Sequence, residues 1–254
     1  MVSEENDDVI IVEYPRLRGK FIVVFDPLDG SSNIDAGVPV GTIFGIYQVP
    51  ANVDVVHLDG AAISSMVLRP GSEMIAAGYA MYGSFTTLVL STGHGVNGYT
   101  LDPSLGEFIL TNPNIEIPKK GKVYSVNDAN QALWDAPVRA YFDSLKETDP
   151  GTGKPSYSSR YIGSMVADVH RTLLYGGIFA YPADQKSRKG KLRLFYECFP
   201  MSFLMEHAGG KALANDKQRI LDLQPQSIHD RSAIILGSPE NIDEFAAFFR
   251  RSPQ

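Results

Sequence analysis

The feature that most constrains the fold is a continuous apolar run that ends abruptly in acidic residues. Residues 21–25 read Phe-Ile-Val-Val-Phe, and Asp26-Pro27 follows at once. An unbroken run of aromatic and β-branched residues predicts a strand that is buried on both faces. Proline cannot donate a hydrogen bond to a neighbouring strand, so we expect regular pairing to stop there.

The rest of the chain alternates strand and helix signals, which predicts a layered α/β fold. Residues 48–65 carry no clear period and are expected to be mostly loop, with one short element whose type the pattern does not define. Predicted strands cover residues 42–47, 74–80, 86–90, 178–181, 191–198 and 233–236, with a hairpin over 99–110. Predicted helices cover residues 164–175 and 201–208, and a last helix begins at Pro239 behind the capping residue Ser238.

A segment rich in Pro, Asn and Lys, residues 111–122, is the best candidate for a domain boundary. We therefore expect an N-terminal domain over residues 1–115 and a C-terminal domain over residues 116–254. The first contains the acidic turn at residues 26–32, and the second contains the basic stretch at residues 186–193.

Composition excludes several classes of function. The chain has 254 residues, 23 Lys and Arg against 29 Asp and Glu, and a net charge of −6, so a nucleic-acid partner is not expected. No apolar run is long enough for a membrane span, and the acidic start does not resemble a signal peptide. The single Cys198 cannot form an internal disulfide and is expected to be a core residue. These observations favour a cytoplasmic protein without a membrane partner.

The segment Asp26-Pro-Leu-Asp-Gly-Ser-Ser32 is the strongest candidate for a site. Its two carboxylates lie where a buried strand ends, a common place for ligand sites in α/β sheets. Carboxylate oxygens suit Mg²⁺, and the backbone amides of Gly30, Ser31 and Ser32 could meet a phosphate. The same residues also fit an ordinary turn followed by a helix cap, and spacing alone does not separate the two interpretations.

The densest basic stretch in this acidic chain covers residues 186–193. Lys186, Arg188 and Lys189 are expected to be solvated in a loop. Lys191 and Arg193 would share one face of the predicted strand with Glu197, because side chains alternate along a strand. Two cations on the same face as a carboxylate would suit an anionic ligand.

Five motifs together resemble one family. The turn above is the signature of the lithium-sensitive, metal-dependent sugar and inositol phosphatases, and the longer string from Phe25 to Asp35 is similar to fructose-1,6-bisphosphatases. The chain resembles that family from Val2 onward. The other motifs are Gly-Thr-Ile-Phe-Gly-Ile-Tyr at 41–47, Arg-Tyr-Ile-Gly-Ser-Met-Val-Ala-Asp-Val-His-Arg at 160–171, Gly-Gly-Ile-Phe-Ala-Tyr-Pro at 176–182 and Gly-Lys-Leu-Arg-Leu-Phe-Tyr-Glu-Cys at 190–198.

The resemblance implies a metal centre for Mg²⁺, with Mn²⁺ or Zn²⁺ as substitutes. Glu4 and Glu5 would otherwise be solvated terminal charges, but they match a metal-bridging glutamate and an adjacent catalytic acid. The implied metal ligands are Glu4, Asp26, the carbonyl of Leu28, Asp29 and Glu197. The implied catalytic residues are Glu5, Asp29 and Arg193.

The resemblance also implies a sugar-phosphate site. Asn127, Tyr161 and Tyr181 match the residues around the 6-phosphate, although Asn130 stands where the family usually has tyrosine. Arg160 matches an arginine that reaches a neighbouring subunit, which implies a homo-oligomer, a dimer or tetramer. The implied substrate-binding residues are Gly30, Ser31, Ser32, Asn127, Arg160, Tyr161, Gly163, Ser164, Met165, Tyr181, Lys191 and Arg193.

The activity implied by the resemblance is Mg²⁺-dependent hydrolysis of the 1-phosphate of fructose 1,6-bisphosphate. The family fold is a layered α-β-α-β-α sandwich, and the chain is expected to lack its first helical part. Because that part carries catalytic groups, a non-catalytic subunit that only binds metal and sugar phosphate, or assembles with intact subunits, is one alternative. Sedoheptulose bisphosphate or an inositol phosphate as substrate is another. AMP regulation is not expected, because Phe21 and Gln48 replace residues typical of the family's AMP site.

Overall fold

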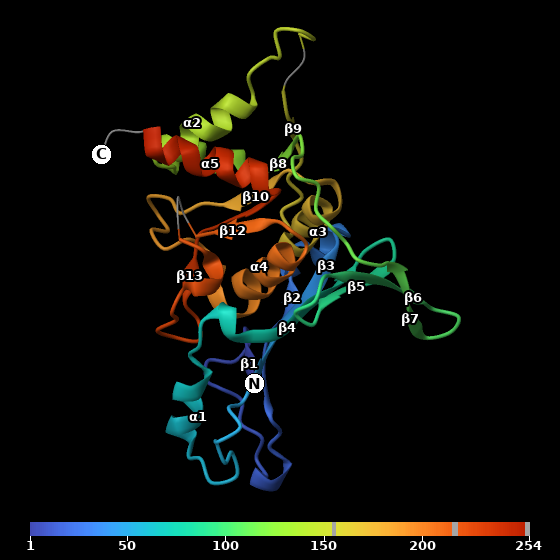
Figure 1. The fold of residues 1–254 in the computed structure, drawn as a ribbon, viewed down its shortest axis with the longest axis vertical. Helices are drawn as coiled ribbons and strands as arrows, with labels where there is room; N and C mark the ends of the chain where they lie inside the picture. Colours follow the sequence, from blue (N-terminus) through green and yellow to red (C-terminus); the bar gives the residue numbers. More distant parts are fainter. Residues whose placement is uncertain (154–155, 215–217, 252–254) are drawn as a thin grey trace.

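The fold is a stack of sheets and helices, seen edge-on in Figure 1. The computed structural model describes residues 1–153, 156–214 and 218–251. Helices α3 (Met165–Tyr175) and α4 (Phe199–His207) lie between two sheets, in contact with β3 and β4 on one side and β10 and β12 on the other. Helices α2 (Ala136–Leu145) and α5 (Pro239–Arg251) pack on each other, and α5 covers the outer face of the second sheet. The order β-α-β-α reproduces the last four layers of the predicted sandwich.

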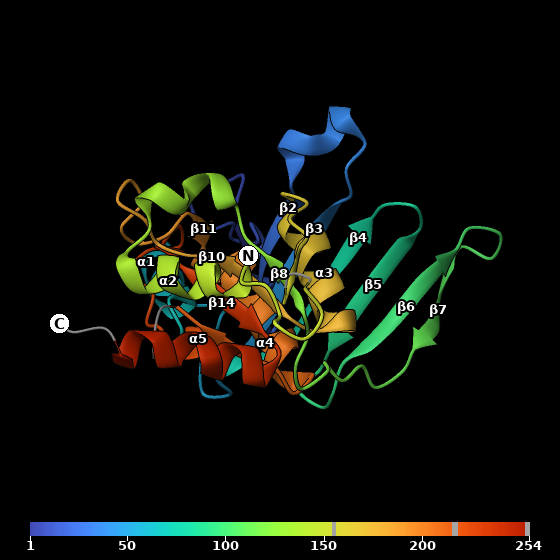
Figure 2. The same cartoon turned by 90° about the horizontal axis from the view of Figure 1, so that it is seen from above.

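The first sheet uses only residues from the first half of the chain. Its seven strands follow one another in chain order, with β1 parallel to β2 and every later pair antiparallel. Figure 2 shows β2 to β7 side by side, with the hairpin β6–β7 at the far edge. The strands are β1 (Val2–Ser3), β2 (Phe21–Asp29), β3 (Val40–Gln48), β4 (Met74–Tyr82), β5 (Thr86–Ser91), β6 (Asn97–Asp102) and β7 (Glu107–Asn112).

The second sheet uses only residues from position 123 onward. Its order is β12-β14-β10-β8-β9, in which β10 runs parallel to β8 and antiparallel to β14. A short two-stranded ribbon joins β11 to β13. These strands are β8 (Val123–Ser125), β9 (Ser158–Ser159), β10 (Ile178–Tyr181), β11 (Leu192–Arg193), β12 (Lys211–Leu213), β13 (Arg231–Ser232) and β14 (Ile234–Gly237).

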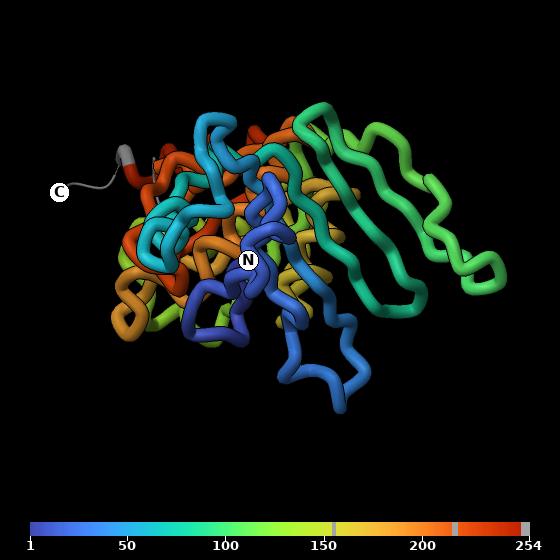
Figure 3. Tube along the Cα trace, turned by 90° about the horizontal axis from the view of Figure 1, so that it is seen from below, coloured from blue at the N-terminus to red at the C-terminus, as the bar shows by residue number. Residues whose placement is uncertain are grey.

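Short helical turns connect these elements. The segment before α1 (Gly60–Val67) lies beside the N-terminal segment (Figure 3). Arg18 Nη1 joins the two by donating to the carbonyls of Val55 and Leu58 at 3.1 Å each. The 3₁₀ turns cover Pro15–Leu17, Ser31–Ala36, Gly71–Glu73, Asp128–Leu133 and Ile220–Asp222, and a π-helical turn covers Leu194–Cys198. No helix among the described residues is long and apolar enough to cross a membrane.

Most predicted elements are confirmed, including the hairpin, the helices and the buried state of Cys198. Residues 60–67 form α1, a short element that begins after the cap Asp59 within the segment expected to be mostly loop. Two expectations were wrong. The strand expected over 191–198 is only two residues long, because the chain turns into a π-helix at Leu194. The run 21–25 is not buried on both faces: Ile22 and Val24 are buried, but Phe21 is 59% exposed.

Two apolar clusters hold the layers together. The larger one fills the space between the sheets and takes residues from both halves of the chain. The smaller one lies under α2 and α5, where Phe142 is fully buried against the rings of Trp134, Tyr141 and Phe245. Burial of this aromatic surface stabilises the outer helical layer on the second sheet.

We expect Phe142→Ala to lower the free energy of unfolding by about 3–5 kcal/mol, because a large buried ring leaves a cavity. Tyr175 is 70% exposed, so Tyr175→Ala is a matched control with a change below about 0.5 kcal/mol. Urea denaturation followed by circular dichroism measures both. Equal midpoints for the two variants would contradict the packing described.

Candidate functional site

A β-bulge brings two aspartates of β2 to the same side of the sheet. Asp26 pairs with Ile43 and Asp29 pairs with Gly41, so β2 has one extra residue over this interval. Residues three apart on a regular strand point to opposite faces, and one inserted residue restores a common face. Pro27 lies in the bulge, where its carbonyl accepts a hydrogen bond from Thr42 Oγ1 at 2.8 Å. The predicted convergence of the two carboxylates therefore has a local cause.

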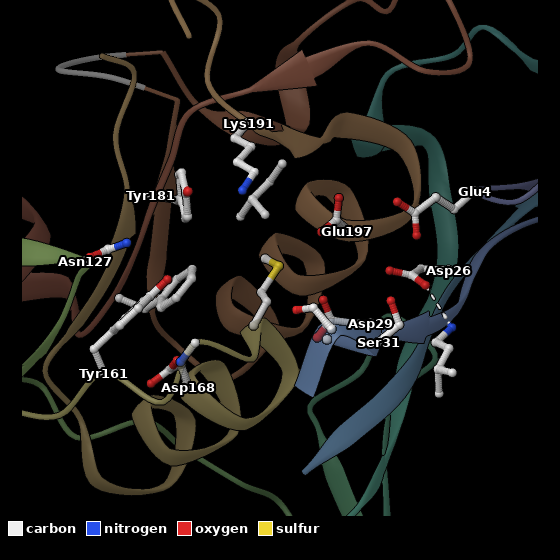
Figure 4. A pocket seen from close by; sticks show the side chains of 17 residues that line it. Glu4, Asp26, Asp29, Ser31, Asn127, Tyr161, Asp168, Tyr181, Lys191 and Glu197 are labelled. Atoms are coloured by element: carbon white, nitrogen blue, oxygen red, sulfur yellow. Dashed lines mark hydrogen bonds between the residues drawn. The ribbon is translucent and has the colours of Figure 1, made fainter. Parts of the chain in front are cut away.

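Two glutamates reach the same point from distant parts of the chain. Glu197 lies in the π-helical turn before α4, and oxygens of Asp26, Asp29 and Glu197 lie within 4.8 Å of one another. Glu4 follows β1, whose Ser3 pairs with Phe25, and Glu4 N donates to the Phe25 carbonyl at 3.2 Å. This parallel register places Glu4 beside Asp26. Figure 4 shows the four carboxylates facing one space.

The three central carboxylates are buried, and no lysine or arginine forms a salt bridge with them within the described ranges. Burial, and then the charges of Glu4 and Asp29, raise the pKa of Asp26 to about 8. Burial raises the pKa of Asp29 to about 6, even though a backbone hydrogen bond opposes the shift. Burial and the neighbouring aspartates raise the pKa of Glu197 well above its ordinary value. Without a bound cation, burial of three ionised carboxylates in one cluster lowers the stability of the folded state.

Each of these carboxylates is oriented by one backbone amide. Leu28 N donates to Asp26 Oδ1 at 2.8 Å, Val166 N to Asp29 Oδ2 at 2.8 Å, and Arg193 N to Glu197 Oε2 at 2.5 Å. Val166 belongs to the first turn of α3, whose amides have no partner inside the helix. The remaining oxygens form a set of hard donors, which fits a divalent cation such as Mg²⁺ or Mn²⁺.

The carboxylates form one end of a cavity of about 420 Å³. The other end is lined by Asn127, Tyr161 and Tyr181, which project toward the same space, with Lys191 above them (Figure 4). Lys191 Nζ lies 5.9 Å from the centre of the Tyr181 ring, and burial raises the pKa of Tyr161 to about 12, so its hydroxyl stays protonated at neutral pH. The cavity therefore has an acidic end and an end with neutral and cationic donors.

Gly30 lies between the bulge and α3 in a conformation that favours glycine. Its φ is +79°, and an added Cβ would fall 3.0 Å from Ser164 Oγ. Ser164 is fully buried at the start of α3, and its hydroxyl has no hydrogen-bond partner in the described part of the chain. This close approach holds the turn that carries Ser31 and Ser32 against the helix.

Four residues that the resemblance assigned to the site do not line the cavity. Glu5 is exposed, and Arg160 donates to the carbonyl of Ser159 at 2.8 Å. Ser164 is buried behind Gly30, and Arg193 Nη1 donates to the carbonyl of His229 at 3.1 Å. The other assigned residues do line it: Glu4, Asp26, Leu28, Asp29, Gly30, Ser31, Ser32, Asn127, Tyr161, Gly163, Met165, Tyr181, Lys191 and Glu197.

The two-residue alternation used to place Lys191, Arg193 and Glu197 on one face does not apply, because residues 194–198 are helical. Lys191 and Glu197 still reach one cavity. The π-helical turn brings the Glu197 carboxylate back to the backbone amide of Arg193, which donates a hydrogen bond to it. Lys191, two residues before Arg193, lines the same cavity. The proximity that the pattern predicted is present, for a different reason.

Asp168 also lines the cavity and was not selected from the sequence. Its buried carboxylate accepts hydrogen bonds from Ser125 Oγ at 2.8 Å and from Ile162 N and Gly163 N at 3.0 Å each. Arg171 Nη2 completes the set at 2.9 Å and also bonds the Arg160 carbonyl. Asp168 thus fixes the loop that carries Arg160 and Tyr161. The signal that could have found it is its place within the motif at 160–171, near the start of the predicted helix.

Comparison with known proteins agrees with this arrangement. Residues 1–113 match the family described as "Fructose-1-6-bisphosphatase, N-terminal domain", and residues 117–250 match "Fructose-1-6-bisphosphatase, C-terminal domain". Cytosolic fructose-1,6-bisphosphatases of Saccharum hybrid and Arabidopsis thaliana are 60% and 59% identical over 98% of this chain and 69% and 70% of their own length. The crystal structure of Leishmania major fructose-1,6-bisphosphatase in holo form superposes with a TM-score of 0.92 at 48% identity, over 98% of this chain and 76% of that one.

We expect cation binding to tighten as the pH rises from about 6 to about 8. Asp26 and Asp29 titrate near 8 and 6, and a cation must displace their protons. Titration calorimetry in two buffers of different ionisation enthalpy should show proton release at pH 7. Affinity that is flat over this range, with no proton released, would contradict the burial of the cluster.

The same shifts set the sign of the stability change without metal. The folded pKa values of Asp26 and Asp29 lie above the unfolded value of about 4, so the folded state holds more protons between these limits. The free energy of unfolding in chelator should therefore fall as the pH rises from about 4 to about 8, and added cation should restore it. Thermal unfolding at several pH values measures the effect.

We expect Asp168→Asn to loosen the loop over residues 160–163 and to lower the free energy of unfolding by about 2–4 kcal/mol, because an amide cannot replace a buried carboxylate that accepts four hydrogen bonds. Asp59→Asn is the control, since Asp59 is an exposed helix cap that asparagine can replace. Hydrogen exchange at the amides of Ile162 and Gly163 reports the change. Unaltered protection in Asp168→Asn would show that the carboxylate does not hold this loop.

Proposed function

Because the chain belongs to the fructose-1,6-bisphosphatase family, we propose that it hydrolyses the 1-phosphate of fructose 1,6-bisphosphate, releasing fructose 6-phosphate and inorganic phosphate. The observation that carries this proposal is the two-ended cavity. Carboxylates at one end suit cations that engage the reacting phosphate, and Asn127, Tyr161, Tyr181 and Lys191 at the other end suit the second phosphate. Its volume of about 420 Å³ is within the usual range for small ligands.

We propose Mg²⁺ as the natural cation, with Mn²⁺ or Zn²⁺ as substitutes, bound by Glu4, Asp26, the carbonyl of Leu28, Asp29 and Glu197. When bound, such ions polarise the phosphoryl group and lower the pKa of an attacking water. The chain's own part is to orient the carboxylates, and the amides of Leu28, Val166 and Arg193 do this while partly opposing the rise in their pKa values.

The substrate would be held at both ends. The protonated Tyr161 hydroxyl and the Asn127 amide can donate to the 6-phosphate, and Lys191, close to the Tyr181 ring, adds a positive charge. At the reacting end the amides of Gly30, Ser31 and Ser32 are available to phosphoryl oxygens. Gly163 and Met165, which line the cavity, would contact the sugar at the start of α3. The buried Ser164 would act only by supporting the turn at Gly30.

Arg193 and Glu5 keep proposed roles from outside the cavity lining. The Arg193 amide bonds Glu197, but its guanidinium donates to the His229 carbonyl, so a role in stabilising charge on the reacting phosphate would need this side chain to turn toward the cavity. Glu5 is the residue next to the proposed metal ligand Glu4, and a catalytic role would need its side chain to turn toward the cavity.

We further propose a homo-oligomer, a dimer or tetramer, in which Arg160 completes a neighbouring site. Its exposure and its position on the loop fixed by Asp168 support this. The division into residues 1–115 and 116–254 also stays a proposal, supported by the two sheets, each built from one half. A cytosolic location is supported by the names of the plant relatives.

Two other functions would use the same cavity. Sedoheptulose bisphosphate is a longer bisphosphate, and comparison of the two substrates' kcat/KM values separates it from the fructose compound. A subunit that only binds metal and sugar phosphate, or assembles with intact subunits, would bind fructose 1,6-bisphosphate without releasing phosphate. The family match favours the hydrolase.

We expect Asp29→Asn to lower kcat for phosphate release by about a hundredfold or more, because a cation ligand at the reacting phosphate is lost. Asp35 is exposed on the same turn and does not line the cavity, so Asp35→Asn is the matched control with near-parental activity. Phosphate release from fructose 1,6-bisphosphate with Mg²⁺ measures both. Equal rates for the parent and Asp29→Asn would overturn the assignment.

A further inference from the structure

Residues 184–190 form a basic loop that does not line the catalytic cavity, and hydrogen bonds and close packing hold its backbone in place. Asp184 Oδ1 accepts hydrogen bonds from Lys186 N at 2.8 Å and Ser187 N at 2.7 Å. Gly190 has φ of +90°, and an added Cβ would fall 2.1 Å from Ala233 N, so the loop packs closely against residues 232–233. Arg188 and Lys189 are therefore carried on a fixed support, although their side chains are exposed.

A second cavity of about 280 Å³ lies beside this loop. Its floor includes the buried side chains of Leu194 and Ala233, and three cationic residues contribute to its wall: Arg188, Lys189 and Arg231. Gln218, Gln224 and Gln226 add amide groups. Cations and amides around an apolar floor suit a small molecule with a phosphate group and a short carbon skeleton.

The charge balance in this cavity favours an anion. Arg188 and Lys189 form no salt bridge with a carboxylate in the described ranges of a chain whose net charge is −6. Among the described residues, Asp230 is the one carboxylate of the lining, and its Oδ2 accepts from Gln226 N at 2.6 Å and Ser227 N at 3.1 Å. Two backbone donors therefore already satisfy the negative group, while the cations remain available.

The two cavities share one wall. Lys191 and Leu192 line the catalytic cavity, and Arg188, Lys189 and Leu194 line the second. Leu192 pairs with Ser232, and Arg231 Nη1 donates to the Lys191 carbonyl at 2.5 Å. An anion that attracts Arg231 would compete with this bond, and the backbone of Lys191 would lose its support. The hydrogen bond between Arg231 and the Lys191 carbonyl would therefore couple the two sites directly.

We propose that the second cavity binds a small phosphorylated anion, and that its occupancy weakens substrate binding through Arg231 and Lys191. The binding part stands on the cavity alone. The coupling part rests on the proposed function, because it assigns Lys191 to the bisphosphate.

Binding is tested by calorimetric titration of the full chain with glycerol 3-phosphate in chelator, so that no cation recruits the anion to the carboxylates. We expect Arg188→Gln/Lys189→Gln to bind at least about tenfold more weakly than the parent, because two charge-assisted contacts are lost. Lys186→Gln is the matched control, since Lys186 lies on the same loop outside the lining. Lys191→Gln should also bind normally. Loss of binding in Lys191→Gln but not in the double variant would overturn the proposal.

Coupling is tested by the KM for fructose 1,6-bisphosphate with and without saturating glycerol 3-phosphate. We expect KM to rise about fivefold in the parent and in Lys186→Gln, and not in the double variant. An equal rise in the double variant would indicate competition in the catalytic cavity and refute the coupling. If the parent released no phosphate at all while glycerol 3-phosphate binding still required Arg188 and Lys189, the proposed function would fail and the binding proposal would stand.

Discussion

The site depends on three buried carboxylates that face one another. Among the described residues, no lysine or arginine forms a salt bridge with them. Asp26, Asp29 and Glu197 come from a bulged strand and a π-helical turn, which are both departures from regular structure. Bulges and π-helical turns are less favourable than the regular ladder and persist where surrounding packing fixes them. Here the core between the two sheets provides that packing, and each carboxylate is further fixed by one backbone amide. A bound divalent cation would relieve the remaining electrostatic repulsion between the three carboxylates.

Much of the fold could be predicted because local patterns and tertiary packing agree. The strand predicted over 42–47 and the helix predicted over 164–175 both formed. The errors occur where tertiary structure decides. Nothing in Phe21–Phe25 reveals that Phe21 is 59% exposed while Ile22 is buried, because an apolar run has no period that separates its faces. Residues 194–198 read as a strand because their apolar composition does not distinguish a buried strand from a buried helical turn.

The residues of the site also fall into those that local sequence patterns reveal and those that only the tertiary structure brings together. Asp26 and Asp29 stand out in the sequence because their spacing and the proline between them are unusual in a buried strand. Glu4 and Glu197 could be added only through the family resemblance, since their proximity depends on the parallel pairing of β1 with β2 and on the turn at Leu194. Asp168 has no pattern that distinguishes it from any acid in the first turns of a helix, yet its carboxylate holds the loop of Tyr161. The local sequence shows which chemical groups a residue offers, and the fold decides which of these groups lie together in one site.

The central claim is that one cation site is formed by Asp26, Asp29 and Glu197 together. Anomalous X-ray scattering from crystals soaked in Mn²⁺ tests it most directly, because it locates the ion without reference to activity. The account predicts a peak within coordination distance of oxygens from all three side chains. A peak held elsewhere in the molecule, or none at these carboxylates at saturating Mn²⁺ and pH 8, would contradict it.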